Sequence, residues 1–246
     1  MTLRDRLASG PWTLALSAGY FGFYAHCGVI SVLEEEGLIP SSLSGASAGA
    51  LVAGFWAAGL PAAEIAERLL QLTKADFWDP APGPGLIRGR RFAALLHEAL
   101  PVRTFAECRI PLRISVFDML TLRTRVLTRG ALEPAIRASC AVPLMFHPVW
   151  PRSRPSVDGG VLDRCALHGI ENDQPVLCHY LIPHGSSPRN AESLPHSEGH
   201  MLLALSALPR CGPNRLHFGV AAYHRARRDM RRALDRPAAD RMLLTR

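Results

Sequence analysis

The chain of 246 residues has the length of one α/β domain and is long enough to bury a substantial core. A hydrophobic content of 48% against a charged content of 20% excludes a disordered chain. The formal net charge of +7 is carried almost wholly by arginine, since Lys74 is the only lysine, and no nucleic-acid-binding motif accompanies it. We therefore expect a single domain over 1–246 with no nucleic-acid partner.

The first ten residues are polar and lack the apolar segment of a signal peptide. The longest apolar run is interrupted by Pro61 and is shorter than the roughly 18 residues needed to cross a bilayer. The six cysteines show neither C-x-x-C spacing nor histidines at metal-ligand spacing, which favours free thiols in a reducing compartment. We expect a cytoplasmic protein without a metal or organic cofactor, and peripheral contact with an anionic membrane surface stays open.

The first predicted unit is a buried strand over 13–17, a glycine-bearing loop over 18–22 and a helix over 23–36. His26 lies within this helix, where a lone histidine near an apolar face is more often a packed residue than a catalytic one. The loop does not form a dinucleotide-binding fingerprint, because Ser17 stands in the place of the first glycine.

The next segment contains the pattern G-x-S-x-G at Gly45, Ser47 and Gly49. This pattern is typical of a sharp turn from a strand into a helix, with the serine at its tip. A Cβ at either glycine would collide with the neighbouring strand or helix. We expect a short strand over 38–43 and a buried helix over 50–58, whose N-terminus favours developing negative charge. A packed turn of small residues is the alternative interpretation.

The middle of the chain is predicted to form two helices and then two strands. The helices cover 61–74, beginning with a proline, and 90–100. The proline- and glycine-rich segment 79–85 between them is either a lid or rim of a substrate site or a simple connection. The strands cover 111–118 and 123–128, and the alternation of the second places its arginines outside.

A second glycine turn follows a short extended run far downstream, where Asp158 precedes Gly159 and Gly160. An aspartate held on such a turn is a candidate general base. Asp163 is a weaker candidate, because it has no glycine turn of its own, and we expect it to support the loop.

The last part of the chain is predicted to contain a buried strand over 176–182, a polar loop over 186–199 and a C-terminal helix. In this helix Tyr223, Met230 and Leu234 recur near helical spacing, while most of its arginines lie on other faces. A basic amphipathic helix of this kind is able to dock on anionic lipid head groups, and a packed helix with a solvated arginine face is the alternative.

Taken in order, the glycine-bearing loop, the early G-x-S-x-G, the segment 135–149 and the late D-G-G resemble the patatin-like phospholipase family. Its members are lipid acyl hydrolases with a Ser–Asp dyad, and the matching elements span about residues 13–168. The resemblance implies a three-layer α/β/α domain with a central, mostly parallel sheet and the site at the strand ends. It also implies that Ser47 is the nucleophile and Asp158 its base, acting on an acyl-lipid substrate.

In that family the first loop has the form G-x-G-x-x-G, often with a basic residue before the last glycine. Here Ser17 replaces the first glycine and Phe21 replaces the basic residue. One oxyanion donor is typically worth on the order of 10²–10³ in rate. The donors implied for this chain are backbone N–H groups of Gly19, Tyr20 or Gly22 and of Ala48. The changed loop leaves open how active the site is.

Two other interpretations stay open. The histidines that follow the serine include His147, His168, His179 and His184, and a Ser–Asp–His order is formally possible with Asp158 and His168 or His184. It fits poorly with so early a nucleophile, since α/β-hydrolases place several strands before theirs. The other interpretation is a catalytically silent lipid-binding or scaffold protein on the same fold. Retention of both Ser47 and Asp158 favours the enzyme.

Overall fold

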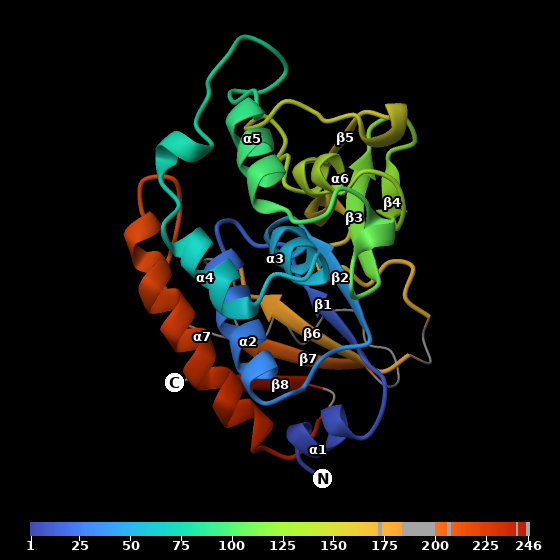
Figure 1. Ribbon diagram of the computed structural model, residues 1–246, viewed down its shortest axis with the longest axis vertical. Coiled ribbons are helices and arrows are strands. Elements are labelled where there is room, and N and C mark those ends of the chain that lie inside the picture. The colour runs from blue at the N-terminus through green and yellow to red at the C-terminus, as the bar shows by residue number, and fades with distance from the viewer. Residues whose placement is uncertain (172–173, 184–199, 206–207, 240, 245–246) are drawn as a thin grey trace.

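The computed structural model describes residues 1–171, 174–183, 200–205, 208–239 and 241–244. Within them, an eight-stranded sheet has the strand order β4-β3-β2-β1-β6-β7-β8, with β5 paired to β3 (Figure 1). The strands are β1 (Thr13–Leu16), β2 (Ser42–Ala46), β3 (Leu112–Asp118), β4 (Arg123–Leu127), β5 (Ser156–Asp158), β6 (Val176–Leu181), β7 (His200–Leu205) and β8 (Arg241–Leu244). All neighbours from β3 through β8 in this order pair in parallel, while β4 and β5 pair antiparallel with β3.

Helices flank the sheet, so the predicted three-layer α/β/α fold with a mostly parallel sheet is confirmed. The α-helices are α1 (Leu3–Ala8), α2 (Phe23–Glu35), α3 (Ala48–Ala57), α4 (Ala62–Leu70), α5 (Arg90–Ala99), α6 (Leu132–Ser139) and α7 (Gly219–Leu234). Short 3-10 helices are η1 (Lys74–Asp76), η2 (Phe105–Glu107), η3 (Pro151–Ser153), η4 (Gly159–Val161) and η6 (Leu216–Phe218).

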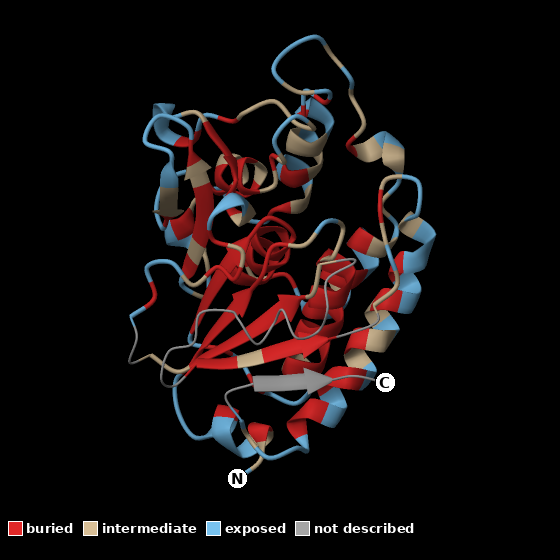
Figure 2. Ribbon diagram, turned by 180° about the vertical axis from the view of Figure 1, so that it is seen from behind, coloured by how far each residue is buried: buried red, intermediate tan, exposed pale blue. Residues whose placement is uncertain are grey.

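The central strands are covered on both faces. Every residue of β1, β2 and β6 is buried, as a parallel strand between two layers requires (Figure 2). Leu14 and Leu16 enter the main core together with residues of α2, α3 and α7, while Ala15 packs on the opposite side with Cys165 and Ile170. The alternation along β1 thus joins two apolar layers across the sheet.

β5 occupies the stretch of β3 that β2 leaves free. β2 pairs with β3 as far as Ala46, which lies opposite Ser115, and the chain then turns into α3. β5 continues along this edge with Asp158 opposite Val116, because β4 already pairs with Val116 from the other edge. The arrangement brings Asp158 to the turn that carries Ser47, although 111 positions separate the two residues.

The C-terminal helix α7 packs along α2, as the packed-helix alternative describes. Its buried residues include Ala226, Met230 and Leu234. The two backbones approach so closely at Gly28 that an added Cβ would lie 2.5 Å from the carbonyl oxygen of Tyr223, so only glycine fits there. Several arginines of this helix form ion pairs, which are Arg225 and Arg232 with Asp229, and Arg227 and Arg231 with Glu35.

Some boundaries differ from those expected. β2 covers Ser42–Ala46 rather than 38–43, because its pairing with β1 begins only at Ser42. The helix expected over 61–74 ends at Leu70, and Lys74 begins η1. Arg125 does not lie outside, because its guanidinium lies 3.7 Å from the buried carboxylate of Asp118. The loop expected over 186–199 lies outside the described residues, and α1, β7 and β8 were not predicted.

Candidate active site

Ser47 lies at the tip of the turn between β2 and α3. Its backbone has φ 53° and ψ −120°, a conformation that L-residues rarely adopt and that is typical of a nucleophile turn. A Cβ on Gly49 would lie 1.9 Å from the carbonyl oxygen of Leu16, and one on Gly45 would lie 2.7 Å from the backbone of Ala50. Both glycines are therefore required by close backbone approach, as the pattern predicts.

Two hydrogen bonds fix Ser47. Its backbone N–H donates to Oγ of Ser139 at 2.9 Å, and this hydroxyl in turn donates to the carbonyl oxygen of Ser115. The Oγ of Ser47 donates to Oδ2 of Asp158 at 2.6 Å. The structure thus brings together the two residues that the sequence marks as nucleophile and base, in the orientation that proton transfer from serine to carboxylate needs.

Asp158 is held by the turn that follows β5. Its Oδ1 accepts a hydrogen bond from the N–H of Gly160 at 2.7 Å. A Cβ on Gly159 would lie 2.0 Å from the carbonyl oxygen of Ser115, which explains the glycine after the aspartate. Burial raises the pKa of Asp158 to about 6, against the lowering effects of the Ser47 hydroxyl, the Gly160 N–H and the charge of Arg164. A carboxylate with this pKa can both accept and return a proton near neutral pH.

The loop after β1 contributes backbone donors to the same place. Gly19, Tyr20 and Ala48 line the cavity at Ser47, and their backbone N–H groups donate no hydrogen bond to a residue that the structure describes. The N–H of Gly22, in contrast, donates to the carbonyl oxygen of Gly19 at 2.9 Å. Gly22 is therefore not a free oxyanion donor in this conformation, which corrects that part of the expected set.

Ser17, which stands in the place of the first glycine of this loop, is held by buried hydrogen bonds. It is fully buried, and its Oγ accepts a hydrogen bond from the N–H of Leu181 at 2.9 Å. Its carbonyl oxygen accepts from Nε2 of His26, so His26 Nδ1 must accept the proton of His179 Nδ1, at 2.8 Å. Burial lowers the pKa of both histidines, and the neutral pair lies directly beneath the loop.

A cavity of about 310 Å³ opens above the dyad. Aromatic and aliphatic side chains make up most of its lining, including Phe21, Phe23, Leu51, Phe77, Phe92 and Phe146. Its polar side chains are those of Ser47, Asp158 and Arg164, together with the phenol of Tyr20 and the thiol of Cys140. The cavity is thus suited to a long apolar group with one reactive polar end.

Within the described residues, the structure gives no support to a histidine or to Asp163 as the partner of Ser47. Among the residues that the structure describes, no histidine lines the cavity at Ser47. His179 pairs with His26, and His147 contacts the carbonyl oxygen of Gly85, while His184 lies outside the described residues. Asp163 accepts hydrogen bonds from Ser115 Oγ and from the backbone N–H groups of residues 167 and 168, which is the supporting role expected of it.

Sequence reasoning did not assign the roles of Ser139 and Arg164. Ser139 lies 92 positions from its partner Ser47, so nothing local in the sequence marks it. Arg164 follows the D-G-G turn and donates through Nη2 to the carbonyl oxygen of Leu181, and its charge acts on Asp158. The sequence shows that Arg164 follows Asp158 closely, but it does not show whether the arginine side chain approaches the carboxylate.

The site combines a serine at a strained strand-to-helix turn with a hydrogen-bonded aspartate on a glycine turn, within an α/β fold. A family model described as patatin-like phospholipase matches residues 14–169. The chain belongs to the patatin-like phospholipase family, whose members are generally lipid acyl hydrolases.

Known relatives agree with this assignment. An uncharacterized NTE family protein of Mycobacterium tuberculosis is 32% identical over 197 residues, which cover 77% of this chain and 55% of the relative. The uncharacterized protein YqhO of Bacillus subtilis is 30% identical over 196 residues, covering 65% of this chain and 67% of the relative. The chain thus spans about half the length of the NTE family relative that it matches.

The solved structure of VipD from Legionella pneumophila has a similar fold. It superposes with a TM-score of 0.58 at 14% sequence identity, covering 92% of this chain and 67% of VipD. At this identity the likeness concerns the fold alone. In the described part of the chain, no helix combines the length and the hydropathy that a membrane span requires.

Proposed function

We propose that the chain hydrolyses fatty-acyl ester bonds of phospholipids, lysophospholipids or other acyl lipids. The observation that carries this proposal is the 2.6 Å hydrogen bond from Ser47 Oγ to Asp158 Oδ2 at the base of an apolar cavity. The cavity receives the acyl chain, and the ester carbonyl then lies next to Ser47. Family membership supports the same class of reaction.

The reaction proceeds through an acyl-enzyme. Asp158 takes the proton of Ser47 Oγ as this oxygen attacks the carbonyl carbon. The oxyanion accepts hydrogen bonds from the N–H groups of Gly19, Tyr20 and Ala48. When the intermediate collapses, the C–O bond to the alcohol breaks and Asp158 returns the proton to the leaving oxygen. Water then attacks the acyl-enzyme with Asp158 again as base, and the fatty acid leaves as Ser47 regains its proton.

Labelling with a fluorophosphonate tests the proposal, because this reagent reacts with an activated serine and is read out as an intact-mass shift. We expect one adduct on the wild type, none on Ser47→Ala and slow labelling of Asp158→Asn. Ser41→Ala is the matched control, because Ser41 is exposed, and it should label at the wild-type rate. An unlabelled but folded wild type, with liposomes present, would instead favour the silent lipid-binding alternative.

Lipid specificity follows from a panel of esters that share one acyl chain. Liberated fatty acid is measured for a phospholipid, a lysophospholipid and a monoacylglycerol, with Ser47→Ala as the blank. Loss of activity in Ser47→Ala on all active substrates would tie each of them to the same acyl-enzyme.

A further inference from the structure

Large apolar side chains are exposed around the mouth of the active-site cavity. Tyr20 and Val161 line the cavity and are 52% and 45% exposed. Leu144, 84% exposed, lies between the lining residues Pro143 and Met145. The carbonyl oxygen of Leu144 accepts a hydrogen bond from the N–H of Leu86, which is also exposed. A further exposed leucine, Leu162, directly follows Val161 in the chain. We call the set Tyr20, Leu86, Leu144, Val161 and Leu162 the apolar rim.

The backbone of Leu144 shows that its exposure is imposed by the fold. Its φ is 65°, in the left-handed region that glycine favours and that is strained for a leucine. The chain on either side is held in place, since Leu86 and Ile87 donate backbone hydrogen bonds to the carbonyl oxygens of Leu144 and Met145. A strained backbone that directs an apolar side chain into solvent, next to a lipid-binding cavity, indicates a surface that is covered during function.

Free positive charge lies beside the rim. In the segment from Leu86 to Arg90, residues alternate between exposed and buried, so Leu86, Arg88 and Arg90 are presented to solvent while Ile87 is buried. Neither guanidinium forms an ion pair or hydrogen bond with a residue that the structure describes. The carboxylate of Asp79 in the same loop accepts instead from the backbone N–H groups of Gly89 and Arg90.

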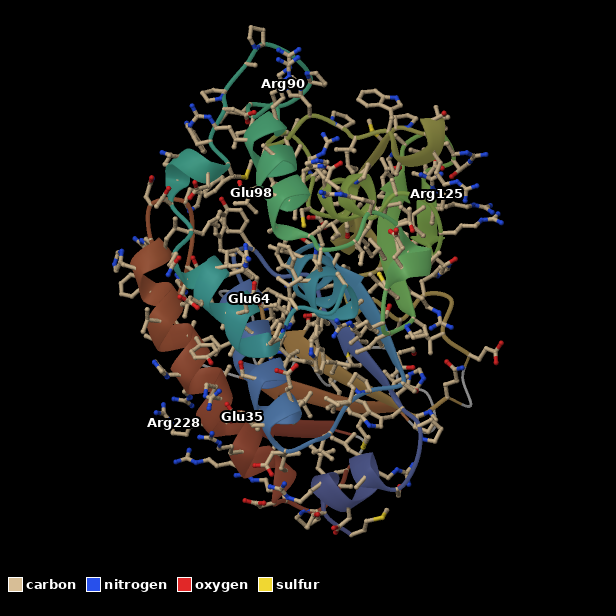
Figure 3. All side chains as sticks on the ribbon, in the orientation of Figure 1. Glu35, Glu64, Arg90, Glu98, Arg125 and Arg228 are labelled. Carbon is tan, nitrogen blue, oxygen red and sulfur yellow. The ribbon has the colours of Figure 1, made fainter. Side chains whose placement is uncertain are left out.

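The helix α7 offers a poorer basic surface than its sequence suggests. Most of its arginines neutralise Glu35 or Asp229 within the fold. Arg228 remains exposed, on a helix that lies well away from the start of α5 where Arg90 is found (Figure 3). Exposed apolar side chains and unpaired arginines therefore lie next to each other at the apolar rim, whereas α7 does not combine the two.

We propose that the apolar rim, together with Arg88 and Arg90, docks this chain on an anionic lipid surface. The rim side chains enter the boundary between head groups and acyl chains, and the two arginines contact anionic head groups. The cavity mouth then opens into the lipid phase, so an acyl chain reaches Ser47 without crossing water. This inference rests on the proposed function for its purpose, but docking itself does not require catalysis.

Vesicle sedimentation with the Ser47→Ala protein tests the inference, since this variant binds lipid without consuming it. The vesicles are phosphatidylcholine alone, or equal parts of phosphatidylcholine and phosphatidylglycerol. Leu86→Ser and Leu144→Gly should each weaken binding to the mixed vesicles by about tenfold, from the lost apolar contact. Leu144→Gly relieves the left-handed strain, so weaker binding by this variant at an undiminished thermal midpoint excludes misfolding as the cause. Ile39→Ser is the matched control, because Ile39 is 49% exposed but precedes the first residue of β2, whereas Ser47 follows its last residue.

The contribution of positive charge to vesicle binding is tested with two arginine variants, one beside the rim and one on α7. Arg90→Gln should weaken binding to the mixed vesicles by about fivefold, and added salt should abolish the difference. Arg228→Gln should bind as the parent does. The inference is overturned if the parent protein binds neither vesicle, or if the rim variants bind normally while Arg228→Gln does not, which would assign docking to α7. If the wild type is folded but is not labelled by fluorophosphonate, while the Ser47→Ala protein binds mixed vesicles through the rim, the hydrolase is refuted and the docking surface is retained.

Discussion

We expect the reactivity of Ser47 to fall as the pH is lowered. The pH at half-maximal reactivity should equal the pKa of Asp158, which burial raises. The base must be ionised to accept the proton of Ser47, and burial raises its pKa from the ordinary 3.8 to about 6. A shift of about two units corresponds to about 3 kcal/mol of differential stabilisation of the protonated form. At pH 5 about a tenth of the enzyme then carries the carboxylate, whereas about nine-tenths does at pH 7.

The assay is the initial rate of fluorophosphonate labelling between about pH 5 and pH 8, which reports on the free enzyme. We expect the rate to rise about fivefold between pH 5 and pH 6, to reach about ten times its pH 5 value at pH 7, and to level off above that pH. An aspartate with its ordinary pKa would keep more than about nine-tenths of the rate at pH 5. A pH-independent rate over this range would therefore refute the reasoning, and circular dichroism at each pH establishes that the chain remains folded.

Three further changes have defined outcomes. Arg164→Met removes a charge that lowers the pKa of Asp158, so the labelling midpoint should move upward by a few tenths to about one unit, while the exposed Arg123→Met should leave it in place. The pKa of His26 is lowered by burial to about 4, so the folded chain binds fewer protons than the unfolded one between that value and 6.5. Stability is therefore lost as pH falls through this window, and His26→Gln should reduce the loss between pH 7 and pH 5, measured by urea unfolding, by about 2 kcal/mol. An unchanged slope would contradict the neutral histidine pair. Gly49→Ala places a Cβ 1.9 Å from a carbonyl oxygen and should destabilise the fold by about 3 kcal/mol or more, whereas Gly10→Ala meets no atom within 4 Å and should be neutral in thermal melting.

The parts of the site that depend on neighbouring residues could be predicted from the sequence, whereas those that depend on distant residues could not. The turn around Ser47 and the turn after Asp158 were predictable, because glycines at fixed spacing have a local steric meaning. The course of β5 was not, because it depends on where β2 stops pairing with β3. The strand β7 is a short apolar run, which periodicity alone cannot distinguish from other buried segments.

Buried polar partners were equally inaccessible from the sequence. His26 was expected to be a packed residue, but its partner His179 lies 153 positions away, and only the sheet brings them together. The prediction that Arg125 is exposed was wrong for a similar reason. Alternation predicts which face of the sheet a residue lies on, but it does not show that a neighbouring strand places the buried carboxylate of Asp118 near that residue. Roles that depend on one long-range contact need the fold.

The position of β5 also sets when the chain becomes reactive during its synthesis. A nascent chain that has emerged only through β3 already contains Ser47 and its turn, but the edge of β3 beside that turn is still empty. Under the proposed mechanism, the serine there has no base and behaves as an ordinary alcohol. It gains its base only when residues 156–158 pair with β3, so labelling of Ser47 would report on the pairing of β5 with β3.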